Sequence, residues 1–362
     1  MPVKMSLFRL LARGIRGKPQ SRNFVDCRFQ LPCLIAIAIL VLLVFLPFSA
    51  AAQTSYNPAQ LEKLYQVETI KYEWLDAKRS RFVPVKIYYP VTEGKVLPVI
   101  IFSHGLGGSR DGYEYLGRHW ASRGYVSVHL QHLGSDDAVW RQSSQIMQSL
   151  KEAAAGVENA VHRPLDVSFA IDQLEILNRE AAPLKGKLDL TRIGVAGHSF
   201  GGFTVMAVIG QVFVTKAGNE FSLADKRIKA AIAMSAPVPR NADLKKSFGS
   251  IKIPCLHMTG TLDQSLVSDV KPEERRLPYD NINSAEQYLL TLQGGDHMVF
   301  AGVRVNKDKG KKDPIFHELI CQVTTAFWDA TLQNNVSARN WLWQKDGFEK
   351  VLGQNGTWER KM

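Results

Sequence analysis

The stretch RIGVAGHSFGG, residues 192–202, is the part of the sequence that decides the fold. Its first half is an apolar run that predicts a buried strand, and the residues after it predict a helix. Between them, Ser199 lies at the centre of a G-x-S-x-G pattern, and Gly197 and Gly201 allow the sharp turn that this pattern requires. Such a turn exposes the serine hydroxyl at the carboxyl edge of a parallel sheet and aims a helix N-terminus at the group that the serine attacks. Glycine-rich turns of other kinds share the local pattern, so the partners of Ser199 must decide between them.

Strands and helices are expected to alternate along the rest of the chain. Short apolar runs predict central strands, and two alternating segments predict an edge hairpin at 67–74 and 81–89. This alternation predicts an α/β fold, with a mostly parallel twisted sheet and helices on both faces. Besides 192–196, central strands are expected at 98–102, 125–130, 228–234, 253–259 and 287–292, and helices at 112–123, 140–155, 167–178, 203–208, 314–332 and 338–351.

Three long connections interrupt this alternation, at 131–160, 212–227 and 264–285. Each follows a sheet strand or the helix after Ser199, so connections that project from the carboxyl edge would form the rims of a pocket. The basic run at 304–312 is expected to be a solvated loop.

The positive charge of the chain is concentrated at its N-terminus. The net charge is +11, and residues 1–30 carry +6 of it, because they hold seven basic residues and one acidic residue. The rest of the chain is only mildly basic, as expected for a solvated globular surface, so its charge does not indicate a nucleic-acid partner.

The N-terminal segment has the features of a secretory signal peptide. A basic stretch precedes the apolar run 34–46, and the small residues AAA at 50–52 follow as a cleavage site. We therefore expect a signal peptide at 1–52, a single catalytic domain at 53–362, and export to the periplasm or the medium. The apolar run is shorter than the ~20 residues of a membrane span. The alternative is an uncleaved signal anchor, through which the chain would contact the membrane.

Two cysteines remain in the expected domain, Cys255 in an apolar strand and Cys321 in a helical pattern. Two buried thiols are the simpler interpretation, and a disulfide between them in an oxidising compartment is the alternative. The metal-binding spacing C-x-x-C does not occur in the sequence.

A serine nucleophile needs a base to accept its proton and an acid to orient that base. Asp263 follows one predicted strand in the loop GTLD, and His297 follows the next in the loop GGDH. Their order after Ser199 is the one that this type of turn requires. We therefore expect Ser199 as nucleophile, His297 as base and Asp263 as acid. The other acids considered are Asp269 and Asp296, and the other bases are His104, His198 and His257.

A glycine-rich turn, SHGLGG at 103–108, follows the first central strand. Its backbone N–H at Leu106, together with that of Phe200, is expected to bind the oxyanion of a tetrahedral intermediate. A phosphate-binding turn is the alternative. The sequence here lacks the Lys-Ser/Thr of such a loop and does not match G-x-G-x-x-G.

The loop that contains His132, Asp136 and Asp137 has side chains of the kind that ligate metals. Capping and turn formation before the helix expected at 140–155 explain these residues more simply. We therefore expect neither a metal nor a cofactor at the site.

Five segments together form a pattern found in one group of enzymes: HGLGG at 104–108, RPLDVSFAIDQL at 163–174, RIGVAGHSFGG at 192–202, GTLD and GGDH. They resemble the serine branch of the dienelactone-hydrolase-like α/β hydrolases, a group that includes chlorophyllases and secreted platelet-activating-factor acetylhydrolases. The resemblance covers residues 65–350 and implies an α/β-hydrolase fold that cleaves carboxylic esters without a cofactor. It also implies the same triad and the same oxyanion donors. True dienelactone hydrolases have a cysteine nucleophile, so Ser199 argues against dienelactone as the substrate.

The sequence thus predicts an exported serine carboxylic-ester hydrolase that works through an acyl-enzyme on a small-molecule or lipid ester. A lipid-directed acetylhydrolase or lipase and a polyester hydrolase are alternatives within this class. A non-catalytic binding protein with the same fold is the alternative outside it. The bulky side chains of Leu106, Phe200 and Phe203 predict a narrow acyl pocket and a preference for short acyl chains.

Overall fold

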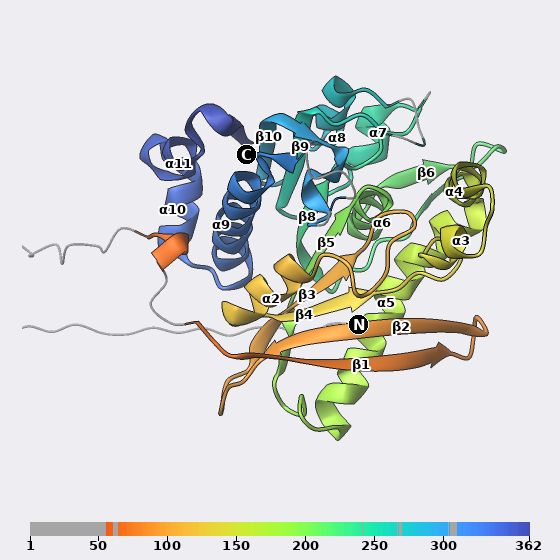
Figure 1. Cartoon of the computed structure of the whole chain (residues 1–362), viewed down its shortest axis with the longest axis horizontal. Coiled ribbons are helices and arrows are strands. Elements are labelled where there is room, and N and C mark those ends of the chain that lie inside the picture. The colour runs from red at the N-terminus through yellow and green to blue at the C-terminus, as the bar shows by residue number, and fades with distance from the viewer. Residues whose placement is uncertain are drawn as a thin grey trace, which may run out of the picture. The chain divides into compact units, whose positions relative to one another are not determined.

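The turn at Ser199 joins β5 (Leu188–His198) to α6 (Phe200–Ile209) in the middle of a nine-stranded sheet (Figure 1). Within the described residues, no helix is both long enough and apolar enough to cross a membrane. The signal peptide expected at 1–52 lies outside the residues that the structure describes. The structure, a computed structural model, describes residues 56–60, 64–240, 242–265, 267, 270–302, 304 and 310–362.

The sheet combines a parallel centre with antiparallel edges. Its strand order is β1-β2-β4-β3-β5-β8-β9-β10-β11, and the six strands from β4 to β10 are parallel. The hairpin β1–β2 borders β4 at one edge, and β11 pairs with β10 at the other, all antiparallel. The predicted α/β fold with a mostly parallel sheet is therefore confirmed. Besides β5, the strands are β1 (Val67–Asp76), β2 (Arg81–Pro90), β3 (Leu97–Ser103), β4 (Val126–Leu130), β8 (Ile228–Met234), β9 (Cys255–Leu262), β10 (Gln287–Asp296) and β11 (Gly356–Lys361).

Each face of the sheet has its own core, because successive side chains of a strand point to opposite faces. On β3, Ile100 and Phe102 pack with residues of α2 (Glu114–Ser122) and α9 (Asp313–Leu332). Val99 and Ile101 pack on the opposite face with residues of α5 (Val157–Glu180) and α6. A strand buried on both faces is apolar along its whole length, which is why these strands were predictable from the sequence.

The remaining elements are short. The helices are α3 (Ala138–Arg141), α4 (Ile146–Ala155), α7 (Leu244–Phe248), α8 (Leu277–Asn281), α10 (Val336–Trp343) and α11 (Lys350–Leu352), and a small hairpin consists of β6 (Val212–Val214) and β7 (Glu220–Ser222). Single 3-10 turns occupy Pro58–Gln60, Pro272–Arg276, His297–Phe300 and Gly353–Asn355, and a π-helical turn occupies Lys345–Glu349.

Two predicted helices differ from the structure near polar or proline residues. The helix predicted at 140–155 is divided into α3 and α4, because Ser143 Oγ accepts a hydrogen bond from the Gln145 N–H (3.0 Å) and so competes with the helical pattern. The helix predicted from residue 167 begins ten residues earlier and continues through Pro164, which is buried in α5. Packing of α5 on the sheet thus outweighs the local cost of a proline.

Three further differences lie in the polar or C-terminal parts of the chain. The helix predicted at 338–351 ends at Trp343, and Gly347 interrupts the next turn with non-helical backbone angles. The strand β11 and the hairpin β6–β7 were not predicted, because β6 has only three apolar residues and the sequences of β7 and β11 are mostly polar.

The two cysteines are free thiols in separate environments. Cys255 lies in β9 within the core on the α5–α6 face, whereas Cys321 lies in α9, which covers the opposite face. A disulfide would have to cross the sheet, so the alternative of a Cys255–Cys321 bridge is wrong.

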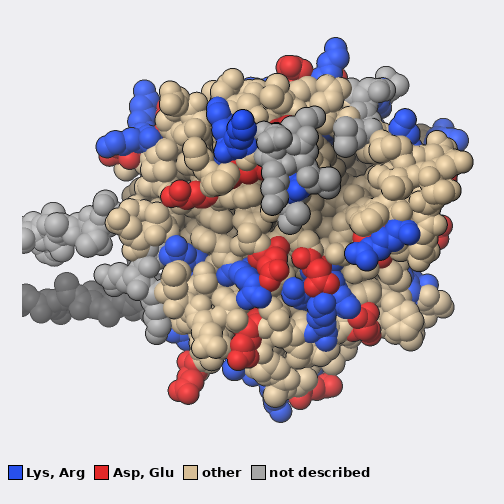
Figure 2. All heavy atoms as spheres, viewed as in Figure 1, with Lys and Arg blue, Asp and Glu red and all other residues tan. Residues whose placement is uncertain are grey.

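Charged side chains of both signs are mixed on the surface. On the face in Figure 2, Lys and Arg lie among Asp and Glu rather than in one basic area. Arg304, in the basic run predicted to be solvated, is only 10% exposed and binds Asp296 (2.7 Å) and also Asp313. At this position the prediction was wrong, because two neighbouring carboxylates hold the guanidinium. Residues 305–309 of the run lie outside the description.

Candidate active site

Five loops meet at the carboxyl edge of the sheet. They follow β3, β5, β8, β9 and β10, and these adjacent parallel strands end side by side. The four elements predicted from the sequence are among them: the turn with Leu106 after β3, Ser199 after β5, Asp263 after β9 and His297 after β10. The loop after β8 begins with Ser235.

The turn at Ser199 is strained and tightly packed. Ser199 has φ 55° and ψ −115°, a combination that is rare for a residue with a side chain. Its N–H donates a hydrogen bond to the Met234 carbonyl at the end of β8 (2.9 Å). A Cβ atom on Gly201 would collide with the Ser103 carbonyl, and one on Gly197 would collide with the Gly201 carbonyl. Only glycine fits at these two positions, as the G-x-S-x-G pattern requires.

Ser199, His297 and Asp263 form a continuous hydrogen-bonded series. The Nε2 atom of His297 lies 2.9 Å from the Ser199 hydroxyl, and its Nδ1 atom lies 2.6 Å from Oδ1 of Asp263. A carboxylate can only accept, so Nδ1–H donates to it, and this tautomer leaves the Nε2 lone pair to face the serine proton. The structure thus brings the three predicted residues together.

The carboxylate of Asp263 lies in a buried polar site. Ser235 Oγ (2.5 Å) and Thr259 Oγ1 (2.8 Å) donate to its Oδ2 atom, and Nε of Arg275 lies 3.6 Å from its Oδ1 atom. Burial by itself raises the pKa of a carboxyl group, but the hydrogen bond from His297 and the charge of Arg275 outweigh burial and lower the pKa of Asp263 to about 2. Asp263 is therefore ionised at neutral pH.

Asp296, one of the two alternative acids, is bonded to groups other than a histidine ring. Asp296 accepts a hydrogen bond from the Met298 N–H (3.0 Å) and caps the turn at His297–Phe300. Both of its carboxylate oxygens also lie 2.7 Å from Arg304. Asp269 lies outside the described residues.

Two of the alternative bases are buried and bonded elsewhere. His257 on β9 bonds to the side chain of Gln287 (2.9 Å), and Nδ1 of His104 donates to the Gly105 carbonyl (2.6 Å). Burial lowers the pKa of His257 to about 4 and that of His104 well below its usual value, so both are neutral at neutral pH.

His198, the third alternative base, connects the two sides of the site. Its Nδ1 atom accepts a hydrogen bond from the Tyr113 hydroxyl (2.8 Å), and its Nε2–H donates to the backbone carbonyl of His297 (2.9 Å). The Tyr113 hydroxyl in turn accepts from the N–H of Gly105 (3.3 Å). His198 therefore links the loop of His297 to the glycine-rich turn after β3, a role that its position beside Ser199 did not predict.

Both predicted oxyanion donors lie in well-held turns. Phe200 is the first residue of α6, so its N–H has no acceptor within the helix. The turn with Leu106 is fixed at the next residue: the Gly107 N–H donates to the Ser135 carbonyl (2.9 Å), and the Trp140 indole donates to the Gly107 carbonyl (2.7 Å). The Leu106 and Phe200 N–H groups donate to no other described residue and remain available for a ligand.

A pocket of about 140 Å³ lies beside Ser199 and His297. Two of the long connections, 131–160 and 264–285, contribute to its wall, as expected for rims at the carboxyl edge. The apolar side chains that line it are Leu106, Met147, Leu150, Val267 and Met298.

Phe200 and Phe203, which were predicted to narrow the acyl side, do not line this pocket. The Phe200 ring packs on the guanidinium of Arg163, with Cζ 4.5 Å from the ring centroid, and contacts Phe203 at 5.7 Å between centroids. Phe203 continues the aromatic contacts to Phe213 of β6 (5.7 Å). These contacts hold both rings away from the wall, so of the three bulky residues only Leu106 borders this space.

The loop considered as a metal site has other contacts. Nδ1 of His132 donates to Asp166 (2.9 Å), and Asp136 accepts from Gln131 (2.8 Å). Asp137 precedes α3 without a capping hydrogen bond and pairs with a residue of that helix instead. Among the described residues, no group of three or more His, Cys, Asp or Glu side chains is arranged to hold a metal ion.

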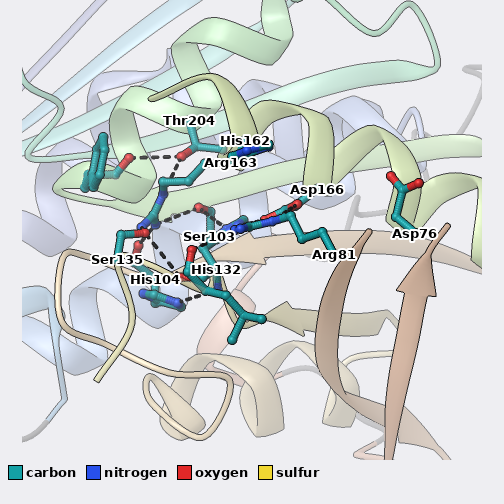
Figure 3. A network of polar contacts seen from close by, with 12 residues as sticks. Asp76, Arg81, Ser103, His104, His132, Ser135, His162, Arg163, Asp166 and Thr204 are labelled. Carbon is teal, nitrogen blue, oxygen red and sulfur yellow. Dashed lines mark hydrogen bonds and ion pairs between the residues drawn. The ribbon is translucent and has the colours of Figure 1, made fainter. Parts of the chain in front are cut away.

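Two buried arginines beside the site were not identified from the sequence. Arg275 lies behind Asp263, and Arg163 of α5 lies beneath the turn after β3, pointing toward Ser103 and Ser135 (Figure 3). The signal for Arg163 was its position at the start of RPLDVSFAIDQL, before a run of apolar helix positions. Arginines are usually solvated, so sequence alone does not indicate such burial.

Comparison with known proteins gives family matches in two parts of the chain. Residues 77–158 match the family described as Platelet-activating factor acetylhydrolase, isoform II. Residues 157–313 match the family described as PET hydrolase-like. The first match contains the turn after β3, and the second contains Ser199, Asp263 and His297.

Individual relatives come from the same two families. Platelet-activating factor acetylhydrolase of Cavia porcellus is 28% identical over 158 residues, which are 36% of this chain and 35% of the relative. The acetylhydrolase of Canis lupus familiaris is 27% identical over 197 residues, 45% of this chain and 41% of the relative. Cutinase 1 of Thermobifida cellulosilytica is 25% identical over 229 residues, 62% of this chain and 68% of the cutinase. The chain therefore spans less than half the length of these two acetylhydrolases.

The sheet order, the strained serine turn and the two family matches agree with one another and with the resemblance noted in the sequence. These findings make the chain similar to the serine α/β-hydrolase group that includes platelet-activating factor acetylhydrolases and cutinases.

Proposed function

We propose that the chain is a serine hydrolase that cleaves carboxylic esters through an acyl-enzyme. The observation that carries this proposal is the hydrogen-bonded series from Ser199 through His297 to Asp263 at the turn between β5 and α6. The acetylhydrolases and cutinases among the relatives support the same reaction class.

In the first half of the reaction, Nε2 of His297 accepts the hydroxyl proton of Ser199 while Oγ attacks the carbonyl carbon of the ester. The carbonyl oxygen becomes an oxyanion and accepts hydrogen bonds from the N–H groups of Leu106 and Phe200. Protonated His297 then donates to the leaving oxygen, the C–O bond breaks, and an alcohol departs from the acyl-serine.

In the second half, His297 accepts a proton from a water molecule, which attacks the acyl-serine through a second oxyanion. Collapse of this intermediate releases the carboxylic acid and returns the proton to Ser199. Asp263 remains ionised throughout and stabilises the imidazolium, as its low pKa favours. All protons move between residues of the chain, substrate and water, so the proposed reaction needs no cofactor.

The apolar pocket beside Ser199 favours substrates with an apolar acyl or alcohol group. A lipid acetyl ester and a polyester both meet this description, as do simple alkyl esters. A panel decides among them: p-nitrophenyl esters of increasing chain length, a phospholipid with a short sn-2 acyl group, and a polyester film. The best substrate is the one with the highest kcat/KM.

Labelling with a fluorophosphonate probe tests the proposal against a non-catalytic fold. An activated Ser199 should react with the probe and should be the modified residue in a peptide digest. Ser222→Ala, a change at an exposed position on β7, is the matched control and should label like the wild type. A folded protein that neither labels nor hydrolyses p-nitrophenyl acetate would overturn the proposal.

Export of the chain belongs to this proposal as well. The basic stretch, the apolar run at 34–46 and the small residues at 50–52 support removal of residues 1–52 during secretion. Mass spectrometry of the exported protein should give a chain that begins near Gln53. An intact N-terminus in the membrane fraction would instead support a signal anchor.

A further inference from the structure

The buried guanidinium of Arg163 lies directly beneath the glycine-rich turn (Figure 3). Its Nη2 atom donates to the His104 carbonyl and to Ser103 Oγ (3.2 Å). Its Nη1 atom donates to Ser135 Oγ (2.9 Å), and its Nε atom donates to Thr204 Oγ1 (3.0 Å). One side chain of α5 thus connects β3, the 131–160 connection and α6.

All four of these partners are neutral oxygens. The nearby carboxylate of Asp166 is already bound by Arg79 (2.8 Å), Arg81 (3.0 Å) and His132 (2.9 Å). The buried carboxylate of Asp136 accepts from Gln131, and although both carboxylates favour the charged form of Arg163 from a distance, no described ion pair includes Arg163. Burial lowers the pKa of Arg163 to about 9, so the side chain still carries its charge at neutral pH. A buried charge without a carboxylate in direct contact is costly for folding, and a neutral side chain of similar length would avoid that cost.

The contacts of Arg163 lead to both expected oxyanion donors. His104, whose carbonyl it binds, is two residues before Leu106. The ring of Phe200 packs on the guanidinium, and Thr204 Oγ1, which accepts from Arg163, donates to the Phe200 carbonyl (3.0 Å). Loss of Arg163 would therefore loosen both turns at once.

We propose that Arg163 is a positioning residue, which holds the Leu106 and Phe200 N–H groups in place and adds a positive charge, contacted by no carboxylate, behind the site where the oxyanion forms. The inference rests on the proposed function, because it requires that a negative charge develops there during ester cleavage. Preorganised charge of this kind stabilises a transition state more than a ground state.

Steady-state kinetics of two variants test this role. Arg163→Met removes the donors and the charge at similar length, and Arg163→Lys keeps the charge but not the planar fork. We expect Arg163→Met to lower kcat for p-nitrophenyl butyrate by about 100-fold with KM within about threefold of wild type, and Arg163→Lys to restore part of the loss. The adduct of a trifluoromethyl ketone with Ser199 carries an oxyanion. The inhibition constant of this ketone should therefore rise by the same factor by which kcat/KM falls.

Arg227→Met is the matched control. Arg227 also contacts α5, through the Ser168 carbonyl (3.1 Å) and Asp172 (2.6 Å), but from the surface. This variant should lower the melting temperature and leave kcat and the ketone constant unchanged. If Arg163→Met unfolds, Thr204→Val, which removes the Nε acceptor together with the hydrogen bond to the Phe200 carbonyl, should still lower kcat several-fold at constant KM.

Three results would overturn the inference. The first is a folded Arg163→Met variant with kcat within twofold of wild type. The second is a loss that appears in KM rather than in kcat and the ketone constant. The third, should Arg163→Met fail to fold, is a Thr204→Val variant with wild-type kinetics. A wild-type protein without esterase activity would instead contradict the proposed function itself.

Discussion

The site has an acid half, formed by the loops of Asp263 and His297, and an oxyanion half, formed by the turns of Leu106 and Phe200. Each half has a buried arginine, but the two arginines contact different partners. Arg275 lies 3.6 Å from the carboxylate of Asp263, so its charge is matched by a permanent anion. Arg163 bonds only to neutral oxygens behind the oxyanion turn. In the resting protein the cation of the acid half lies next to an anion, whereas the cation of the oxyanion half contacts no described carboxylate and gains a nearby anion when the oxyanion forms.

This difference separates the effects of mutation in the two halves. A change in the acid half removes a partner from a resting ion pair, so stability and the orientation of His297 both depend on it. A change in the oxyanion half acts mainly on a charge that exists during the reaction, so it should appear in rate more than in stability.

The largest effect is expected at Ser199, where the two halves meet. Ser199→Ala should lower kcat by about 10⁴-fold or more, because the acyl-enzyme cannot form. The fold should be retained, since alanine is smaller and keeps the same backbone. Ester hydrolysis and circular dichroism check both statements. A variant with more than a few per cent of wild-type turnover would exclude Ser199 as the nucleophile.

Removal of the permanent anion should have the next largest effect. Asp263→Asn should lower kcat by about 10⁴-fold, because an amide favours the wrong tautomer of His297 and cannot stabilise the imidazolium. A loss smaller than about tenfold would mean that another acid orients the histidine. Asp296→Asn is the natural control, since Asp296 bonds to Arg304 and Met298 instead.

The same anion makes a testable contribution to stability. The pKa of Asp263 is about 2 in the folded chain, below the ~3.9 of an unfolded aspartate. Because the folded value is depressed, this stabilisation is fully present above pH ~4 and disappears as the pH falls toward 2. The difference in denaturation midpoint between wild type and Asp263→Asn should therefore be constant from about pH 5 to 8 and shrink below about pH 4. A difference that grows in acid would contradict the assignment.

The acid half was predictable from the sequence because its residues directly follow strands. Strands buried on both faces are largely apolar, and glycines near the carboxyl ends of β9 and β10 mark where the loops of Asp263 and His297 begin. The turn at Ser199 was predictable for the same reason, with the added constraint that only glycine fits beside it.

The arginine behind the oxyanion half was not predictable in the same way. The predicted helix begins at residue 167, where its apolar positions start, whereas α5 begins at Val157, so Arg163 was outside the predicted helix. Its role depends on how α5 packs against the turn after β3, a contact between segments 59 residues apart. Long-range packing of this kind has no local sequence signal, and the packing of Phe200 on Arg163, away from the pocket, is missed for the same reason.

A smaller effect is expected from pH. His297 must be unprotonated to accept the proton of Ser199, so kcat/KM should rise from about pH 5 to 8 with a slope near one logarithmic unit per pH unit at the acid end. Burial lowers the pKa of His198 to about 3, with the neighbouring His297 contributing, and burial lowers that of His257 to about 4. These histidines stay neutral in this range. A flat profile would argue against a histidine base.

Arg275 provides the direct comparison with Arg163. Arg275→Met should lower stability by about 3 kcal/mol, since it leaves a buried carboxylate without its cation. Its kcat should fall only about tenfold, because the hydrogen bonds to Asp263 from Ser235 and Thr259 remain. Chemical denaturation and kinetics on both arginine variants check this contrast. Equal losses of rate and stability in the two variants would show that the halves do not differ as described.

The smallest effect concerns acyl-chain length. A pocket of about 140 Å³ with Leu106 and Leu150 in its wall should accept acetyl and butyryl groups more readily than octanoyl, with selectivity of about 1 kcal/mol per methylene at best. Leu150→Ala removes three carbons from the wall and should move the optimum of kcat/KM toward longer chains. Val214→Ala, at an exposed position on β6, should leave the optimum in place.

This prediction concerns the substrate rather than the oxyanion, so Arg163→Met should lower the rate for every chain length by the same factor. A maximum at octanoate or longer in the wild type would contradict the short-chain preference, and a chain-length-dependent loss in Arg163→Met would mean that Arg163 shapes the pocket instead of the oxyanion site.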